Sequence, residues 1–183
     1  MSRPSLLRRI LPRFFRRARR EDGTATIEFV FVVPIIMTIF MASIEAGFYM
    51  AKHVMMERGL DMVIRDLRLG NLGLVDHNSL RTLICDATPI LEDCEHILKV
   101  EMRPISTATF NMPNAPATCI DRGEAVEQLT DFTLGGSHEI MIVRVCAVQD
   151  PIFPSTGIGL QLRADAQGGY QMVAASVFVN EPR

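Results

Sequence analysis

The stretch GTATIEF (residues 23–29) decides the architecture of the chain, because it places a carboxylate at the start of a long apolar segment. From Phe29 to Ile44 no charged residue occurs. A charged side chain inside hydrocarbon costs about 2.5–3.5 kcal/mol on insertion scales, so such residues usually have a function. Glu28 is therefore a candidate functional residue. The alternative is an interfacial glutamate whose carboxylate simply reaches water.

The apolar segment is long enough to cross a membrane. From Ile27 to Ala51 there are 25 residues, which span about 37 Å as a helix, against a hydrocarbon core of about 30 Å. Pro34 lies inside this run, and membrane helices accommodate proline more readily than soluble ones. A cleaved secretion signal has an apolar stretch of only about 7–15 residues. We therefore predict a transmembrane helix over residues 24–51.

Basic residues before the apolar segment predict its orientation. Residues 1–23 form a leader with eight arginines, namely Arg3, Arg8, Arg9, Arg13, Arg16, Arg17, Arg19 and Arg20. Such residues remain in the cytoplasm, so the chain should run with its N-terminus inside and its C-terminus outside. Residues 21–183 carry 11 basic and 21 acidic residues. This acidic body argues against a nucleic-acid partner.

The helix is predicted to continue beyond the membrane as an amphipathic extension over residues 52–70. Four apolar residues recur at helical spacing on one face, namely Met56, Leu60, Val63 and Leu67. Gly70 and Asn71 then end the pattern. One helix from Thr24 to Leu69 should result, and its outer half should pack on a globular domain.

Residues 71–183 predict a small domain of short helices and strands. Asn78 or Ser79 can cap a helix over residues 80–87. The remaining elements are a strand over 97–103 that ends at Pro104, a loop over 104–118, a short helix over 124–131, and strands over 139–148 and 170–179. This order predicts the α+β class, with a long N-terminal helix packed on a small antiparallel sheet.

Four cysteines follow the apolar segment, on the side predicted to lie outside the cytoplasm. An even number of cysteines in an exported domain indicates disulfides, and four cysteines allow three connectivities. We favour the pairs Cys85–Cys94 and Cys119–Cys146. A metal site is the alternative, since Cys94 and His96 are close in sequence, but the spacings match no zinc pattern.

Residues for catalysis or cofactor binding form no motif in this sequence. The histidines are scattered, at His53, His77, His96 and His138. Cysteine–histidine catalysis remains an alternative, because such residues meet in space rather than in sequence. Paired glycines at 135–136 and 168–169 indicate turns rather than phosphate loops. We expect no enzyme activity, no metal and no cofactor.

The order of residues around the apolar segment resembles the TadE-like family of tight-adherence (Flp) pilus assembly proteins. The resemblance is carried by GTATIEFVFVVP (residues 23–34) and by IEAG (44–47), in which a glycine, a Glu-Phe pair, a proline and a Glu-x-Gly recur in the family's order. The ending ASVFVNEP (175–182) is similar as well. Two departures are Thr24, which is bulkier than the usual residue, and Val179, where the family often has arginine.

The resemblance implies a pseudopilin, a minor pilin-like subunit whose helix acts in assembly. It implies cleavage by a prepilin peptidase between Gly23 and Thr24, after which Glu28 neutralises the N-terminal amine of a neighbouring subunit. The assembly residues carried over from the family are Glu28, Phe29, Pro34, Glu45 and Gly47. The implied partners are the membrane, the peptidase, other pilin-like subunits and the pilus assembly machinery.

The implied location is the bacterial inner membrane, crossed once, with residues 71–183 in the periplasm and a possible place in the surface pilus. Two alternatives remain open at this point. One is an uncleaved, signal-anchored periplasmic scaffold or binding protein that never enters a filament. The other is a secreted hydrolase, which would have to lose the apolar segment.

Overall fold

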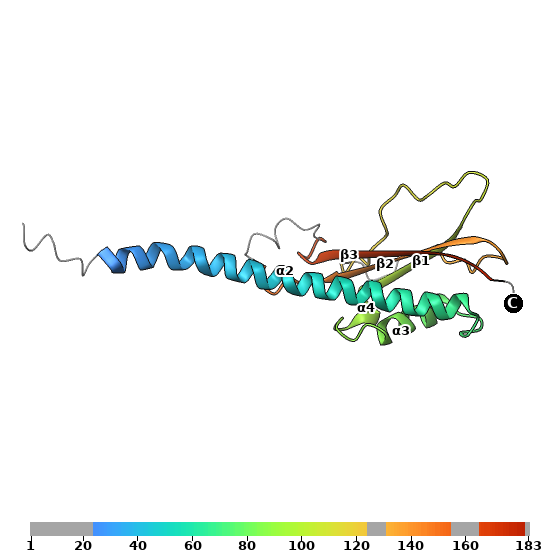
Figure 1. Ribbon diagram of the computed structural model, residues 1–183, viewed down its shortest axis with the longest axis horizontal. Coiled ribbons are helices and arrows are strands. Elements are labelled where there is room, and N and C mark those ends of the chain that lie inside the picture. The colour runs from blue at the N-terminus through green and yellow to red at the C-terminus, as the bar shows by residue number, and fades with distance from the viewer. Residues whose placement is uncertain (1–23, 124–130, 155–164, 182–183) are drawn as a thin grey trace, which may run out of the picture. The chain divides into compact units, whose positions relative to one another are not determined.

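A computed structural model describes residues 24–123, 131–154 and 165–181 (Figure 1). The elements in chain order are α2 (Thr24–Arg68), α3 (His77–Asp86), α4 (Cys94–Ile97), β1 (Leu98–Ile105), β2 (Ile140–Gln149) and β3 (Tyr170–Val179). Tertiary contacts divide the chain into two units, Met1–Met41 and Ala42–Arg183. The α+β class expected from the sequence is confirmed.

The part of α2 in the first unit is an uncovered apolar helix. Its best 18-residue window has a mean hydropathy of 2.4, and none of that window is buried. By length and composition this is the one segment of the described residues that can cross a membrane. The side chains of Phe29, Phe31 and Ile39 are each more than half exposed. An apolar surface of this extent requires lipid or a protein partner.

The second part of α2, from Ala42, covers a sheet. The predicted stripe is confirmed, because Met56, Leu60, Val63 and Leu67 are all buried. They pack with Leu80 and Ile84 of α3 and with side chains from one face of the strands. The helix ends one residue before the predicted Leu69, and Gly70 follows with φ +73, a conformation that glycine adopts without strain.

Asp76 caps helix α3, whereas the sequence analysis named Asn78 or Ser79 as the cap. The Asp76 carboxylate accepts from the backbone N–H of Ser79, and the Ser79 hydroxyl accepts from the N–H of Asp76. This reciprocal capping box starts the helix at His77, three residues before the predicted start. The pattern Asp-x-x-Ser was the signal that the sequence analysis overlooked.

The three strands form one antiparallel sheet in the order β1-β2-β3. The prediction for β3 has the observed bounds, and β2 is shifted by one residue from its prediction. The prediction that β1 ends at Pro104 is wrong, because the strand continues to Ile105. Proline is tolerated in β1 since β1 is an edge strand of the sheet. The predicted helix over 124–131 lies, except for Asp131, outside the described residues.

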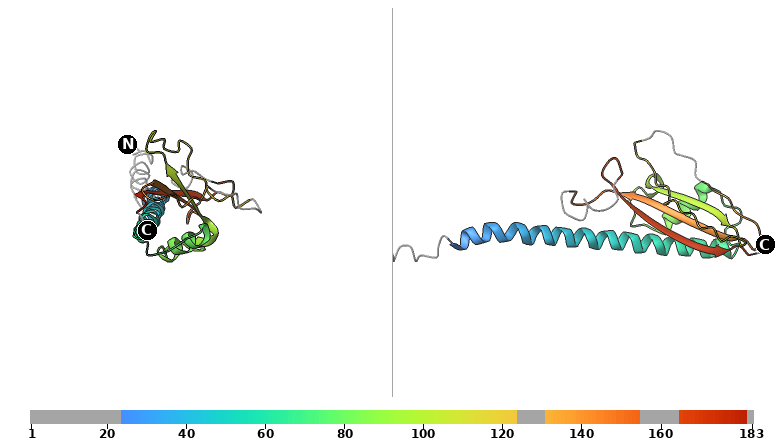
Figure 2. Two further views of the ribbon diagram at one scale, coloured as in Figure 1. Left: turned by 90° about the vertical axis from the view of Figure 1, so that its right-hand side faces the viewer. Right: turned by 90° about the horizontal axis from the view of Figure 1, so that it is seen from above.

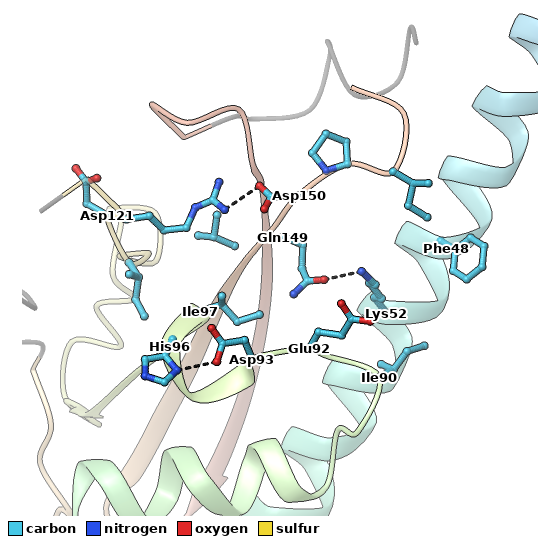
Figure 3. Close-up of a pocket in the computed structure, with 15 residues that line it drawn as sticks. Phe48, Lys52, Ile90, Glu92, Asp93, His96, Ile97, Asp121, Gln149 and Asp150 are labelled. Carbon is cyan, nitrogen blue, oxygen red and sulfur yellow. Dashed lines mark hydrogen bonds and ion pairs between the residues drawn. The ribbon is translucent and has the colours of Figure 1, made fainter. Parts of the chain in front are cut away.

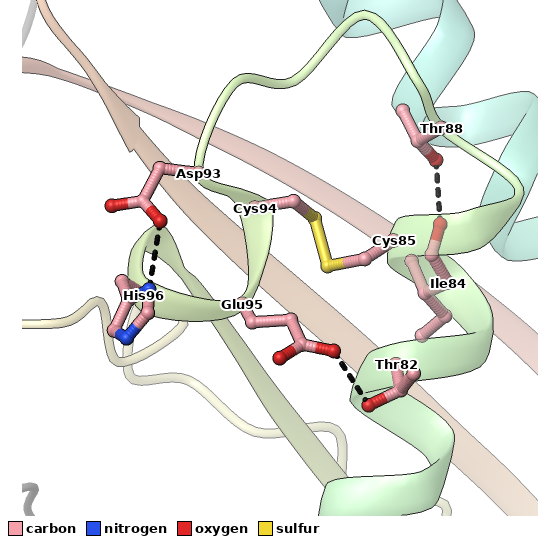
Figure 4. Close-up of a disulfide and its surroundings, with 8 residues drawn as sticks. All are labelled: Thr82, Ile84, Cys85, Thr88, Asp93, Cys94, Glu95 and His96. Atoms are coloured by element: carbon pink, nitrogen blue, oxygen red, sulfur yellow. Dashed lines mark hydrogen bonds and ion pairs between the residues drawn. A yellow bond between two sulfur atoms is a disulfide. The ribbon is translucent and has the colours of Figure 1, made fainter.

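Two disulfides fasten the connections of the domain, in the pairing favoured from the sequence. Cys85 at the end of α3 is bonded to Cys94 at the start of α4 (Figure 4). A hydrogen bond of 2.9 Å from Thr82 to Glu95 runs beside this disulfide. Cys119 is bonded to Cys146 of β2, and this bond ties the long 106–123 connection to the middle of the sheet.

Gly59 allows α2 to lie directly against the residues that follow α3. A Cβ atom at this position would stand 2.2 Å from Thr88 Oγ1 and 3.3 Å from the Ala87 carbonyl oxygen. Thr88 is fully buried, and its hydroxyl donates to the Ile84 carbonyl (Figure 4). Gly47 on the same helix has no atom within 4 Å of such a Cβ.

We predict that Gly59→Ala destabilises the domain by about 1–3 kcal/mol, the usual cost of overpacking a core. Gly47→Ala is the matched control and should be neutral or slightly stabilising, because alanine is the better helix former. Thermal unfolding of the full chain in detergent measures both. Since Thr88→Ala removes the colliding oxygen, the double variant should regain much of the loss. An unchanged midpoint for Gly59→Ala would contradict the packing.

An ion pair holds the 106–123 connection over the outer face of the sheet. Arg144 of β2 donates to Glu101 of β1 at 2.5 Å and to the Ala115 carbonyl at 2.7 Å. Glu101 also accepts from the backbone N–H of Thr118 at 2.7 Å. Burial acts to raise the pKa of Glu101, but the Thr118 hydrogen bonds and the Arg144 charge outweigh it and lower that pKa from 4.5.

A lowered pKa means that Glu101 stabilises the fold at neutral pH and loses this contribution as the pH falls through the folded-state value. We predict that Glu101→Gln lowers the free energy of unfolding at pH 7. The variant should also show a weaker loss of stability than the parent below pH 4.5. Denaturant unfolding at several pH values measures this, with the exposed Glu57→Gln as control. Parallel pH curves for Glu101→Gln and the parent would contradict the role.

Candidate assembly helix and its anchoring contacts

The start of α2 carries the residues for which the sequence predicts processing and assembly. Thr24 and Glu28 are four residues apart in the helix, so they lie on the same face about one turn apart. Glu28 is exposed, and Phe29 is 66% exposed. Gly23 and the leader over 1–23 lie outside the described residues. The geometry of the described part thus leaves Glu28 free for a group from another chain.

The exposed apolar surface continues along α2 beyond the first unit. Phe48, Met50 and Val54 are each at least half exposed, although they follow the predicted membrane segment closely or fall within it. Gly47 is exposed beside them and has open space around it. A glycine in such a surface allows a second helix to approach closely. Pro34, which the resemblance also names as an assembly residue, is likewise exposed within α2.

Glu45 has a different environment from Glu28. It is 1% exposed, and its two carboxylate oxygens accept from the backbone N–H groups of Ile152 at 3.2 Å and Phe153 at 2.9 Å. A buried carboxylate requires such charge-assisted hydrogen bonds. Within this chain, Glu45 therefore anchors the turn that follows β2 to the helix. From the sequence, Glu45 was expected to be an assembly residue, and nothing there indicated this contact within the chain.

Neighbouring residues of α2 fasten the adjoining ends of β2 and β3. Lys52 donates to Gln149 at 2.5 Å, and His53 Nε2 lies 3.1 Å from the Val173 carbonyl oxygen. The ring of Tyr49 meets that of Tyr170 edge to face, with 5.3 Å between centroids. Burial, with a further effect of the Glu45 charge, raises the pKa of Tyr170 to about 12. Tyr170 is thus a neutral partner beside the Glu45 carboxylate.

A groove of about 810 Å³ opens between α2, the residues around α4 and the end of β2 (Figure 3). Its apolar lining is Phe48, Ile90, Ile97, Ile120, Val148, Pro151 and Ile152, and its polar lining is Lys52, Glu92, Asp93, His96, Asp121, Arg122, Gln149 and Asp150. His96 pairs with Asp93 at 2.7 Å, on an exposed surface. No three histidine, cysteine or carboxylate side chains within the described ranges are grouped to hold a metal ion.

Arg122 is the main cross-link of this region. It pairs with Asp150 at 2.7 Å and with Asp165 at 2.8 Å, and so joins the segments after β2 and before β3. The hydrogen bond from Arg122 is the main cause of a lowered pKa for Asp165, and the same pairing raises the pKa of Arg122. A Cβ at Gly169 would stand 2.3 Å from Arg122 Nη2, so a larger residue there would displace the Arg122 guanidinium. Two ion pairs thus lie within the groove, His96–Asp93 and Arg122–Asp150.

Asn180, in the NEP ending, joins the far end of the sheet to a loop. Its side-chain amide donates to the carbonyl oxygens of Leu134 at 3.3 Å and Gly136 at 3.2 Å. Its backbone N–H donates to Glu139 at 2.9 Å. Glu181 beside it pairs with Arg68 at the end of α2 at 3.0 Å. These contacts fasten the ending to the rest of the domain, and the sequence alone did not reveal them.

Comparison with known families agrees with the family resemblance that the sequence of the helix indicated. A family model described as TadE-like protein matches residues 23–65. This segment is TadE-like. The match contains Gly23, the Glu28-Phe29 pair, Pro34, Glu45 and Gly47, and it associates the apolar helix with tight-adherence pilus systems. Searches of curated proteins and of solved structures found no match to the chain.

We predict that Glu45→Ala removes the charged acceptor of the Ile152 and Phe153 backbone N–H groups, at a cost of about 1.5–3 kcal/mol, the usual range for hydrogen bonds to a charged group. Their hydrogen exchange should accelerate, and the free energy of unfolding should fall. Mass-spectrometric hydrogen exchange on the full chain in detergent measures this, with the exposed Glu57→Ala as control. Unchanged exchange at residues 152–153 would show that the anchor is not formed.

Proposed function

We propose that the protein is a minor pilin-like subunit, a pseudopilin, of a tight-adherence pilus machine. Its helix inserts in the inner membrane with the leader in the cytoplasm, and its sheet domain folds in the periplasm. A prepilin peptidase cleaves after Gly23. The work of the protein is assembly rather than catalysis.

The observation that carries the proposal is the uncovered apolar helix with an exposed carboxylate near its start. An apolar surface over this length is stable only in lipid or in a bundle of similar helices. In such a bundle, Glu28 needs a counter-charge, because a buried carboxylate without a partner is costly. A new amine on Thr24 of a neighbouring subunit supplies one. The TadE-like match over residues 23–65 supports this use of the helix.

The disulfides and the polar cross-links support a domain that acts as a rigid body. Disulfides persist in oxidising compartments such as the periplasm, which agrees with the proposed orientation. The second candidate is an uncleaved membrane anchor for the same domain. The anchored position of Glu45 favours neither candidate, because it stabilises the domain in both.

We predict that Glu28→Ala inserts into the membrane at parental levels but reduces piliation about tenfold or more, because the neighbour's amine loses its partner. Cells that express the variant as their sole copy are scored by electron microscopy, with the exposed Asp66→Ala on the same helix as control. N-terminal sequencing in cells with and without the prepilin peptidase accompanies the count. A mature start at Thr24 that depends on the peptidase supports the pseudopilin. An intact leader together with normal piliation would favour the plain anchor.

A further inference from the structure

Strand β3 is an uncharged edge strand of the sheet. None of its ten residues, Tyr170–Val179, is charged or is proline. Edge strands of natural proteins are usually protected by charges, proline, bulges or a covering segment, because their free backbone groups can pair with another chain. A long edge without such protection therefore marks a place where pairing is tolerated or used.

The alternation of β3 shows which backbone groups are free. The N–H of Asn180 donates to Glu139, so even-numbered positions direct their backbone groups toward β2. The backbone N–H and C=O groups of the odd-numbered positions point away from β2, because the Val173 carbonyl oxygen contacts His53 of α2 instead. Within the described residues, no partner bonds the N–H and C=O groups of Ala175, Val177 and Val179. These three positions offer a ladder of donors and acceptors.

The side chains at the same edge are apolar and exposed. Val173, Val177 and Val179 are 41%, 49% and 48% exposed, whereas the even-numbered Met172, Ala174 and Phe178 are buried in the core. The opposite edge of the sheet differs. There, Met102 of β1 donates to Asp131 at 3.0 Å and accepts from Thr133 at 2.9 Å, so a chain segment already covers it. In the described sheet, the open edge is therefore the one formed by β3.

Helix α2 lines the open edge with polar side chains and runs parallel to β3. His53 reaches Val173, Asp61 accepts from Ser176 at 3.2 Å, and Arg68 pairs with Glu181. Glu57 lies on the same helix face, 3.6 Å from His53, and is about half exposed. Figure 2 shows β3 beside this part of α2. A strand placed against β3 would have valines on one side and the Glu57 and Asp61 carboxylates on the other.

We propose that the outer edge of β3 binds an extended segment of a different protein chain, which adds a fourth strand to the sheet. The incoming strand alternates apolar and basic residues. Its apolar side chains lie beside Val173 and Val177, and its basic side chains lie over Glu57 and Asp61. A second copy of β3 is a poorer occupant, because it has no basic residue to offer these carboxylates. Strand addition of this kind takes affinity from the main chain and specificity from alternate side chains.

The test uses the full chain in neutral detergent and a fluorescent peptide of about ten residues that alternates valine and lysine. A peptide that alternates valine and glutamate is the matched control. We expect the lysine peptide to bind at least about tenfold more tightly, a difference of about 1.4 kcal/mol. Hydrogen exchange should show fast Ala175, Val177 and Val179 amides in the free protein and slow ones with the lysine peptide.

Variants locate the binding. Val177→Lys should weaken the lysine peptide about tenfold, while Leu74→Lys, a change at an equally apolar residue that is 87% exposed, should have no effect. Glu57→Gln should weaken binding about threefold, in the range of cross-strand charge pairs. Slow exchange of the three amides in the free protein, equal affinity for both peptides, or binding unaffected by Val177→Lys would each overturn the proposal. Self-association of the free chain that Val177→Lys abolishes would also overturn it, since the occupant would then be a second copy.

Discussion

The packing of the apolar stripe of α2 against one face of the sheet is the interaction on which the domain depends. A three-stranded antiparallel sheet has one apolar face that must be covered, and here Met56, Leu60, Val63 and Leu67 cover it. The close fit requires a glycine where the helix passes Thr88. The disulfides and Arg122 do not build this core; they hold the connections around it, where a small domain buries too little apolar surface to fix long loops.

The helical stripe and the last strand were predictable because each has a strong local pattern. The stripe repeats at helical spacing over three turns, and residues 170–179 end at the polar Asn180 after a run without charge. The contacts of Glu45, Arg122 and Asn180 were not predictable, because their partners are backbone groups or charges that are distant in the sequence. Glu45 and Ile152 are separated by 107 residues. No local pattern encodes such a pairing, although a carboxylate in an apolar run signals that one is needed.

Two carboxylates of α2, those of Glu28 and Glu45, therefore have different environments. Glu28 is exposed in an apolar stretch and has no partner among the described residues, whereas Glu45 is buried and both of its carboxylate oxygens accept hydrogen bonds within the domain. Both belong to the segment that matches the TadE-like family. The structure separates them by chemistry: one can still accept a partner, and the other already has two.

This difference bears on how much of α2 is available to a membrane. Because Glu45 is hydrogen-bonded inside the domain unit that begins at Ala42, the residues from Ile27 to Ile44 are the apolar part that precedes the anchor. At 1.5 Å per residue they span about 27 Å, slightly less than an average hydrocarbon core of about 30 Å. A short apolar segment is accommodated by local thinning of the bilayer or by association with other helices. Under the proposed function, the exposed Phe48, Met50 and Val54 would then lie at the membrane surface, where neighbouring subunits would cover them. The mismatch between the short apolar segment and the bilayer thickness would destabilise an isolated helix, and it would therefore favour association of the helix with neighbouring subunits.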